Sequence, residues 1–153
     1  MLVSVHISTN ISKIRRQPGE FIYVIEGKGD AVNTVTGTGY ENSTTRNRLE
    51  LAALSEALSR IKDGTEVTVF LSNTYIRTPI ELGWIYKWSE TWNTRNGPVK
   101  NADLWQKVLV QLMTHTLIWS DETDSYADWM QAELKRNRKQ IELEHWKGGA
   151  GYE

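Results

Sequence analysis

The order of extended and helical patterns along the chain is the feature that most constrains its fold. Segments 2–8, 21–27 and 31–41 are rich in β-branched residues, which is typical of strands. An amphipathic helix is expected at about 45–62, and the apolar run 66–72 has the length of a buried strand. Three strands joined by loops should form an antiparallel meander, and a fourth strand reached through a helix should run parallel to the first. We therefore predict an α/β fold with a mixed sheet flanked by helices.

The rest of the chain adds helices and one further strand. Helical patterns occupy about 74–89, 102–116 and 124–139, and the alternating segment 141–146 has the pattern of a strand. The expected sheet thus has about five strands, within a single domain that covers residues 1–153.

The composition limits the class of protein. A chain of 153 residues can form one domain with a hydrophobic core, and its net charge of −1 gives no bulk attraction for polyanions. The absence of cysteine excludes disulfides, thiolate metal sites and cysteine nucleophiles, and it agrees with a reducing cytoplasm. No apolar run approaches the roughly 20 residues of a membrane span, and the N-terminus lacks a signal-peptide pattern. We expect a cytoplasmic protein that does not contact membranes.

One residue of the first long helix does not fit its surroundings. Helical spacing places Glu50 near the middle of an apolar face formed by Leu49, Ala53, Leu54, Ala57, Leu58 and Ile61. A carboxylate there costs several kcal/mol unless it is paired, bound to a metal or solvated. Two interpretations remain open. Glu50 is either an acid that the helix dipole favours and that reaches solvent, or a functional acid near the C-terminal ends of the strands.

Two ordered motifs resemble type 1 ribonuclease H. The segment "TTRNRLELAALSEAL" (44–58) resembles the T-x-N-x-x-E-L-x-A signature that opens the first long helix of that family. The segment "GWIYKWSETWNTRNGPVKNADLWQ" (83–106) resembles its basic protrusion, with W-I-x-x-W, a further Trp, P-V-K-N and D-L-W-Q in order. Together with the strand order, the resemblance covers roughly residues 2–116, the family-like core.

The resemblance implies a nuclease site that is incomplete in this chain. The family cuts the RNA strand of RNA–DNA hybrids with two Mg²⁺ ions, held by acids on the first strand, the first long helix, the end of the fourth strand and near the last helix. Glu50 matches the helix acid, but Ser8 and Ser72 stand at the two strand positions. A hydroxyl carries no charge and is a poor ligand for a hard cation beside a carboxylate. The resemblance therefore implies a degenerate active site in which Glu50 is a remnant, and a metal ligand only if a metal binds.

The tail admits two alignments with the family. In the first, "LIWS" (117–120) is the last strand and Asp128 replaces the last acid. In the second, which we favour, 117–140 is an insertion, and 141–153 holds the last strand and a truncated loop. The second alignment leaves open a homodimer or a partner chain that supplies a missing C-terminal helix.

The resemblance also implies residues that contact nucleic acid: Arg15, Arg16, Arg46, Asn47, Thr74, Trp84, Trp88 and Lys100. The two Trp side chains, one helical turn apart, could equally pack the protrusion against the body of the protein. Where the family usually has a Lys and Arg cluster after the second Trp, this chain has "SET". Residues 84–107 carry four cations against two acids. We expect weak binding that is soon lost with salt.

Three functional hypotheses follow. The favoured one is a catalytically impaired ribonuclease H-like protein that binds an RNA–DNA hybrid or duplex, needs no cofactor and is not an enzyme. The second is an active ribonuclease H that requires Mg²⁺ or Mn²⁺ and uses a rearranged site, with Glu50 and Asp128 or the nearby acids Asp121, Glu122 and Asp124. Those nearby acids are more simply explained as a solvated turn and helix start. The third hypothesis is a protein-interaction scaffold whose Trp residues form the interface.

Overall fold

The computed structural model describes residues 2–29 and 31–150, with side chains for 2–29, 31–140 and 142–144. The elements are, in chain order, β1 (Leu2–Thr9), β2 (Gln17–Lys28), β3 (Val32–Thr44), α1 (Arg46–Ser59), β4 (Glu66–Phe70), α2 (Thr74–Glu81), α3 (Trp84–Trp88), β5 (Asn93–Thr94), β6 (Gly97–Pro98), α4 (Ala102–Leu112), β7 (Thr116–Trp119) and α5 (Ala127–Ala150). None of the helices in this described part is long and apolar enough to span a membrane.

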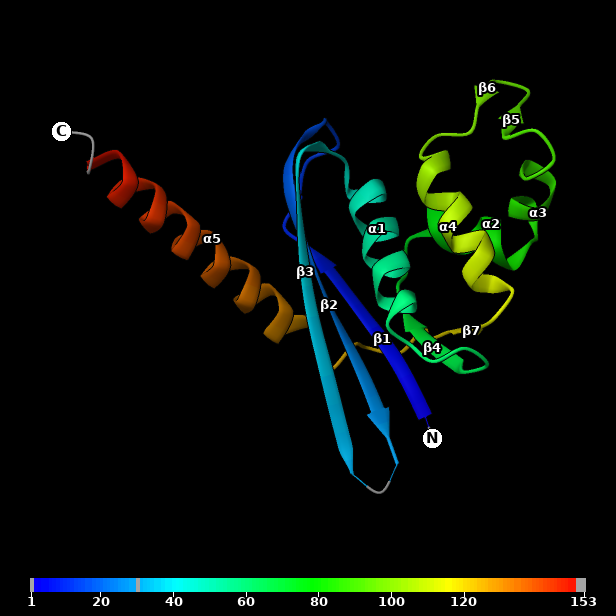
Figure 1. Cartoon of the computed structure of the whole chain (residues 1–153), viewed down its shortest axis with the longest axis horizontal. Helices are drawn as coiled ribbons and strands as arrows, with labels where there is room; N and C mark the ends of the chain where they lie inside the picture. The colour runs from blue at the N-terminus through cyan, green and yellow to red at the C-terminus, as the bar shows by residue number, and fades with distance from the viewer. Residues whose placement is uncertain (1, 30, 151–153) are drawn as a thin grey trace.

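The main sheet has five strands in the order β3-β2-β1-β4-β7 (Figure 1). The meander of β1, β2 and β3 is antiparallel, and β4 runs parallel to β1, with Val5 opposite Val69. β7 extends the sheet parallel to β4. The α/β fold with a mixed sheet, predicted from the order of patterns, is confirmed.

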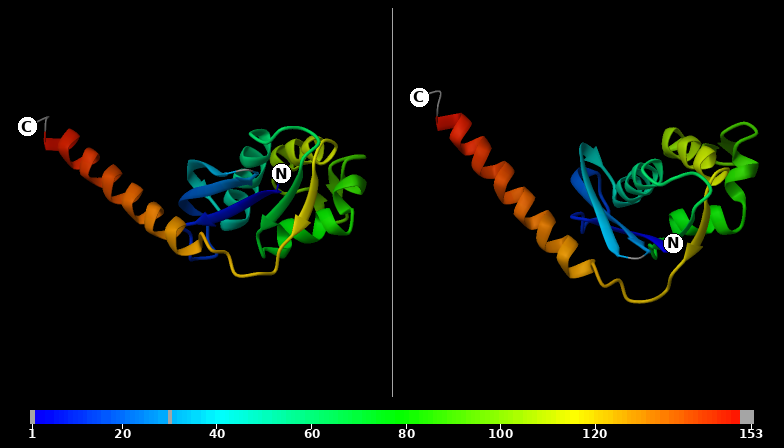
Figure 2. Two further views of the ribbon diagram at one scale, coloured as in Figure 1. Left: turned by 90° about the horizontal axis from the view of Figure 1, so that it is seen from below. Right: turned by 60° about the horizontal axis from the view of Figure 1, so that its bottom comes forward.

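Helices cover both faces of the sheet. α1 lies on one face and α5 on the other (Figure 1 and Figure 2). The main core includes the fully buried Leu51 and Leu54 of α1 and Trp105 of α4, packed with the inward side chains of β1 and β4. A smaller core joins Ile22 and Val24 of β2 to Met130 and Leu134 of α5. The end of β1 is therefore enclosed by one helix on each side.

The helix expected at 74–89 is divided in two. Gly83, with a φ of 75°, separates α2 from α3. Pro79 lies inside α2 without ending it. The break turns α3 away from α2 and begins the protrusion, which continues through the β5–β6 hairpin to α4 (Figure 1).

The tail differs from the prediction. The strand expected at 141–146 is wrong, because these residues belong to the 24-residue helix α5. Glu, Leu, Lys, Arg and Gln dominate residues 131–144, and such side chains favour a helix, as does the i,i+4 ion pair between Arg138 and Glu142. β7 at 116–119 takes the place beside β4 instead, as in the alignment that we did not favour. Because α5 packs on β1 and β2, the chain itself supplies a helix on this face, and the reason for a partner helix disappears.

A polar cluster anchors the segment between β7 and α5 to the sheet. His6 on β1 is buried, and its Nδ1 lies 2.7 Å from Asp124 Oδ1. The His6 ring stacks on Phe70 at 4.4 Å between centroids. The hydroxyl of Tyr126 donates a hydrogen bond to the carboxylate of Glu26 on β2. This bond lowers the pKa of Glu26 and, together with burial, raises the pKa of Tyr126 to about 12.

We expect Tyr126→Phe to lower the free energy of unfolding by about 1–3 kcal/mol at pH 7, because a hydrogen bond to a charged group is lost. The wild-type bond should be fully present below the unfolded Tyr pKa of about 10 and lost as the pH rises to about 12. On the acid side it should be present above about 4.5 and lost as the pH falls through the lowered pKa of Glu26. Urea unfolding of wild type and variant at several pH values measures both free energies of unfolding. If their difference did not change with pH, the proposed contribution of the bond would be contradicted.

Candidate active and nucleic-acid-binding site

A cavity of about 310 Å³ lies where β1 and β4 end, beside the start of α1. We call it the central cavity. Its polar lining comes from Ser8, Arg46, Glu50, Ser72, Ser120, Asp121, Glu122 and Asp124. Because β1 and β4 are parallel, Ser8 and Ser72 leave the sheet at the same edge, and α1 brings Glu50 to them. The sequence-based expectation that Glu50 faces the C-terminal ends of these strands agrees with this geometry.

The carboxylate of Glu50 is buried and held on both oxygens. Glu50 is only 3% exposed, so the interpretation in which it reaches solvent does not hold. Its Oε1 accepts a hydrogen bond from Arg46 Nε at 2.9 Å. Its Oε2 accepts one from Asn73 Nδ2 at 2.8 Å. A positive charge and an amide thus satisfy this acid within the protein.

Asn73 was not identified as a site residue from the sequence, although its position between a strand and a helix indicated a cap. It follows β4 and caps α2, since its side-chain oxygen accepts a hydrogen bond from the backbone N–H of Tyr75 at 3.0 Å. Its amide nitrogen is then directed to Glu50 and also donates to Asn47 Oδ1 at 2.8 Å. An Asn between a strand and a helix predicts the cap, but the partner of its amide depends on the tertiary fold.

The two serines at the expected acid positions differ in their surroundings. Ser8 is half-buried, and its hydroxyl accepts a hydrogen bond from Gln131 Nε2 of α5 at 2.5 Å. The same amide nitrogen lies 3.0 Å from the carbonyl oxygen of Thr9. Ser72 is exposed at the mouth of the cavity. Gln131 gave no signal in the sequence, because only the docking of α5 places it beside β1.

Three acids that follow β7 line the same cavity, Asp121, Glu122 and Asp124, and two of them, Asp121 and Asp124, are paired. Arg77 Nη1 of α2 lies 2.5 Å from Asp121 Oδ1, and this hydrogen bond lowers the pKa of Asp121. Asp124 pairs with His6. Asp128, which the first tail alignment placed at the last acid position, is exposed on the first turn of α5 and outside the lining of the cavity.

The arrangement does not fit a pair of hard cations. Within residues 2–29, 31–140 and 142–144, no three His, Asp or Glu side chains converge in a way that could hold a metal ion. Mg²⁺ requires several oxygen ligands in near-octahedral geometry. Both oxygens of Glu50 are engaged by Arg46 and Asn73, and the strand positions offer hydroxyls.

The expected nucleic-acid residues lie at three places: around the central cavity, in the protrusion and in the loop after β1. Arg46, Asn47 and Thr74 are exposed around the central cavity. In the protrusion, Trp84 is 48% exposed, whereas Trp88 is half-buried with its ring in edge contact with Trp105 at 5.5 Å. Trp88 therefore packs the protrusion against the body of the protein. Trp84 faces solvent, where a residue that contacts nucleic acid should lie.

The basic residues outside α1 are also at the surface. Lys100 lies exposed where the protrusion rejoins α4, and Arg15 and Arg16 are exposed in the loop after β1. Arg16 donates a hydrogen bond to the carbonyl oxygen of Ser43, which ties this loop to β3.

The family model and the individual relatives that match this chain indicate the same family. The family model for RNase H matches residues 5–122. The ribonuclease H of Rickettsia massiliae is 42% identical over 83 residues, which are 53% of this chain and 54% of that protein. The ribonuclease H of Prosthecochloris aestuarii is 32% identical over 111 residues, 67% of this chain and 76% of that protein. The chain thus spans about half the length of the first of these relatives.

Solved structures share the fold at lower identity. LC9-RNase H1, described as a type 1 RNase H with the type 2 active-site motif, superposes with a TM-score of 0.63 at 22% identity. The match covers 77% of this chain and 61% of that one.

We expect Asn73→Ala to lower the free energy of unfolding by about 2–4 kcal/mol, because the helix cap and the hydrogen bond to buried Glu50 are both lost. Asn73→Ser should keep the cap and lose the amide's bonds to buried Glu50 and to exposed Asn47, for a cost of about 1–3 kcal/mol that comes chiefly from Glu50. Asn47→Ala, at an exposed neighbour of the same network, is the control and should change stability little. Urea unfolding measures all three. An Asn73→Ser variant as stable as wild type would show that Glu50 does not depend on Asn73.

Proposed function

We propose that this chain, which belongs to the ribonuclease H family, binds RNA–DNA hybrid or nucleic-acid duplex weakly and has a catalytically impaired centre. The observation that carries the proposal is the pair of hydroxyls, Ser8 and Ser72, that flank Glu50 at the ends of the two parallel strands. Cleavage by two metal ions requires several carboxylates at one place to hold both cations.

Charge at the centre supports the loss of cleavage. The guanidinium of Arg46 lies against Glu50, so the remaining carboxylate is neutralised without a metal. An incoming Mg²⁺ ion would have to displace this cation and the amide of Asn73, and Ser8 and Ser72 would offer it hydroxyls in place of carboxylates. The acids Asp121 and Asp124 are likewise engaged by Arg77 and His6.

The exposed surface supports nucleic-acid binding. Arg46 and Asn47 lie at the start of α1 on the rim of the central cavity, and Trp84 and Lys100 lie on the protrusion. Exposed Arg and Lys side chains contact phosphates, and an exposed indole can stack on a base or sugar. Because the protrusion has a small excess of positive charge, we expect binding that is weak and sensitive to salt.

A cleavage assay tests the impaired centre. With a labelled RNA–DNA hybrid and Mg²⁺ or Mn²⁺, we expect the wild type to give no cleavage above the metal-free background. The Ser8→Asp, Ser72→Asp double variant should gain metal-dependent cleavage, because two carboxylates then join Glu50, and adding Glu50→Gln should remove that gain. Calorimetric titration with Mn²⁺ gives a second readout. Robust wild-type cleavage that Glu50→Gln abolishes would overturn the proposal.

One observation favours a second candidate, an active metal-dependent ribonuclease H with a rearranged site. Asp121, Glu122 and Asp124 line the same cavity as Glu50, although the strand acids are replaced. If this candidate is correct, the wild type should cleave the hybrid, and Asp121→Asn or Asp124→Asn should reduce that cleavage. Asp128→Asn, at an exposed acid of the same segment outside the cavity, is the matched control and should have no effect. Equal activity of all three variants would count against this candidate.

A further inference from the structure

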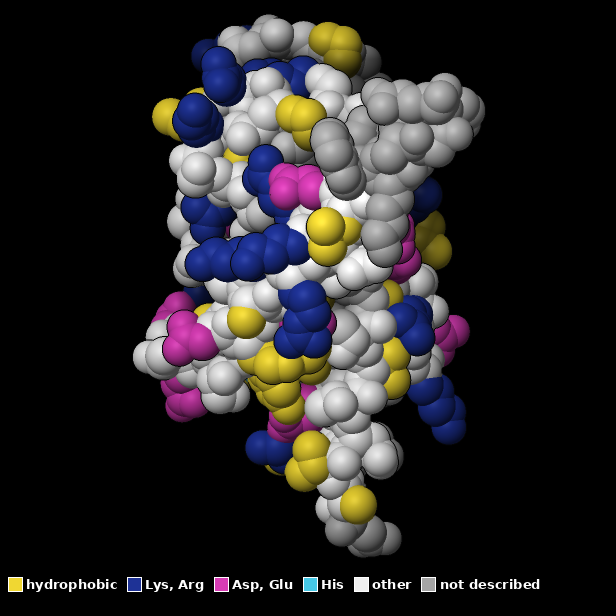
Figure 3. Space-filling model, turned by 90° about the vertical axis from the view of Figure 1, so that its left-hand side faces the viewer, with side chains coloured by type: hydrophobic (Ala, Val, Ile, Leu, Met, Phe, Trp, Pro, Cys, Tyr) yellow, Lys and Arg dark blue, Asp and Glu magenta, His cyan; other side chains and the backbone are white. Residues whose placement is uncertain are grey.

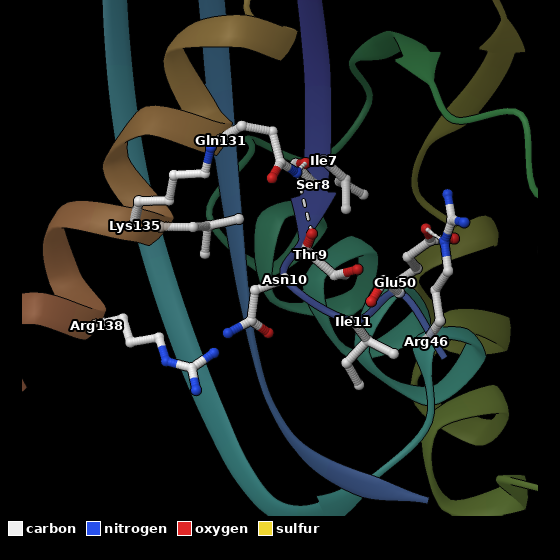
Figure 4. A pocket seen from close by; sticks show the side chains of 12 residues that line it. Ile7, Ser8, Thr9, Asn10, Ile11, Arg46, Glu50, Gln131, Lys135 and Arg138 are labelled. Carbon is white, nitrogen blue, oxygen red and sulfur yellow. Dashed lines mark hydrogen bonds and ion pairs between the residues drawn. The ribbon is translucent and has the colours of Figure 1, made fainter. Parts of the chain in front are cut away.

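A second cavity, of about 560 Å³, adjoins the central cavity on the side of α5. We call it the α5 groove. Gln131, Lys135 and Arg138 of α5 form one wall, and residues 7–12 at the end of β1, with Arg46 and Glu50 of α1, form the rest (Figure 4). The groove and the central cavity share four lining residues: Ile7, Ser8, Arg46 and Glu50.

The α5 groove continues away from the centre. A third cavity, of about 400 Å³, shares Asn10 and Arg138 with it and reaches Arg15 in the loop after β1 and Gln17 at the start of β2. The two cavities therefore form a continuous path from Glu50 to this loop. Four cationic side chains line the path: Arg46, Lys135, Arg138 and Arg15.

The stretch of α5 that lines the groove is locally basic, although acids of the same helix, Asp128, Glu142 and Glu144, flank it. Residues 131–140 contain four cations, Lys135, Arg136, Arg138 and Lys139, against the single acid Glu133. The protrusion has a smaller excess over more than twice as many residues. On the face seen in Figure 3, Lys and Arg side chains gather over the upper half. Such an uneven distribution concentrates positive potential along one path.

The acids that line the path balance only part of this charge. Glu50 offsets Arg46, and the other three cations of the path face Glu142 and Glu20. Glu50 is held by Arg46 and Asn73. Glu142 lies 3.2 Å from Arg138, but both side chains are about two-thirds exposed, and such surface ion pairs contribute about 0–1 kcal/mol. A phosphate can therefore replace Glu142 at little cost. Glu20, at the far end, is buried and lies within hydrogen-bond distance of Asn137 Nδ2 on α5.

The groove is built on a fixed framework. Met130 and Leu134 of α5 pack on β2, and Gln131 is hydrogen-bonded to the end of β1. Asn10 accepts a hydrogen bond from the backbone N–H of Glu20 at 2.8 Å, and its amide nitrogen points toward Arg138 (Figure 4). Cationic and neutral donors thus face the same space, as phosphate oxygens require.

We propose that the α5 groove binds the phosphodiester backbone of a nucleic-acid strand, with Lys135 and Arg138 as its phosphate contacts. The strand would run from the central cavity along α5 toward Arg15. This inference rests on the proposed nucleic-acid binding and names the path that one strand takes.

Binding of a fluorescent RNA–DNA hybrid to the full chain, followed by anisotropy over a salt series, tests the path. The Lys135→Ala, Arg138→Ala double variant should bind about tenfold more weakly at low salt. The slope of log K against log salt should fall by about 1.4–1.8, because each lost phosphate contact removes roughly 0.7–0.9. The Lys135→Arg, Arg138→Lys variant retains both charges and should bind like wild type.

The matched control is the Arg136→Ala, Lys139→Ala double variant. It removes the same charge from the same exposed stretch of α5, at two residues outside the linings of both cavities along the path. We expect its salt slope to equal that of wild type. Circular dichroism checks that the helix is intact in each protein.

The outcomes separate this inference from the proposed function. Equal losses in the test and control variants would overturn the inference, because only bulk charge would then matter. Wild-type binding that neither double variant weakens would also overturn it, while the proposed function stands. A wild type that binds neither hybrid nor duplex would overturn both, and would leave the protein-interaction role of the exposed Trp84 surface to be tested.

Discussion

The parallel pairing of β1 with β4 is the constraint on which the rest of the structure depends. It requires a crossover, which α1 provides, and it places the ends of both strands at one edge of the sheet beside the start of that helix. Glu50 is consequently buried at this edge, and a buried carboxylate must find partners. Arg46, one helical turn earlier, and Asn73, at the cap of the next helix, supply them.

The ends of β1 and β4 also show how the charge of Glu50 is balanced within the protein. A cluster of several acids is self-repelling unless cations are bound, whereas one acid beside one guanidinium is not. In this chain the hydroxyls of Ser8 and Ser72 flank Glu50, and Gln131 bonds to Ser8. Two of the acids after β7 pair with Arg77 and with buried His6. Glu50, Asp121 and Asp124 thus have partners within the protein.

The sequence was sufficient for the parts of the fold that depend on local patterns. The β-branched runs of β1, β2 and β4, the amphipathic spacing of α1 and the motif around Glu50 predicted the mixed sheet and the position of the central cavity. The tail failed for a physical reason. The segment "IELEHW" alternates over only six residues, a length at which strand and helix patterns are not distinct. Its secondary structure depends on the rest of the chain: β7 occupies the place beside β4, and the apolar face of α5 packs on β2.

The partners of the site residues were beyond sequence reasoning for a related reason. Gln131 lies 123 positions from Ser8, and Asp124 lies 118 positions from His6. Both contacts exist because α5 returns across the face of the sheet opposite α1 (Figure 2). That return also sets the basic stretch of α5 beside the end of β1, on the other side of the centre from the protrusion. The protrusion has "SET" in place of a basic cluster, whereas residues 131–140 of α5 carry four cations against one acid. Lys135 and Arg138 therefore offer phosphate contacts on the side of the central cavity opposite the protrusion. In our proposal, a strand bound at this edge follows α5, even though the protrusion retains its Trp residues.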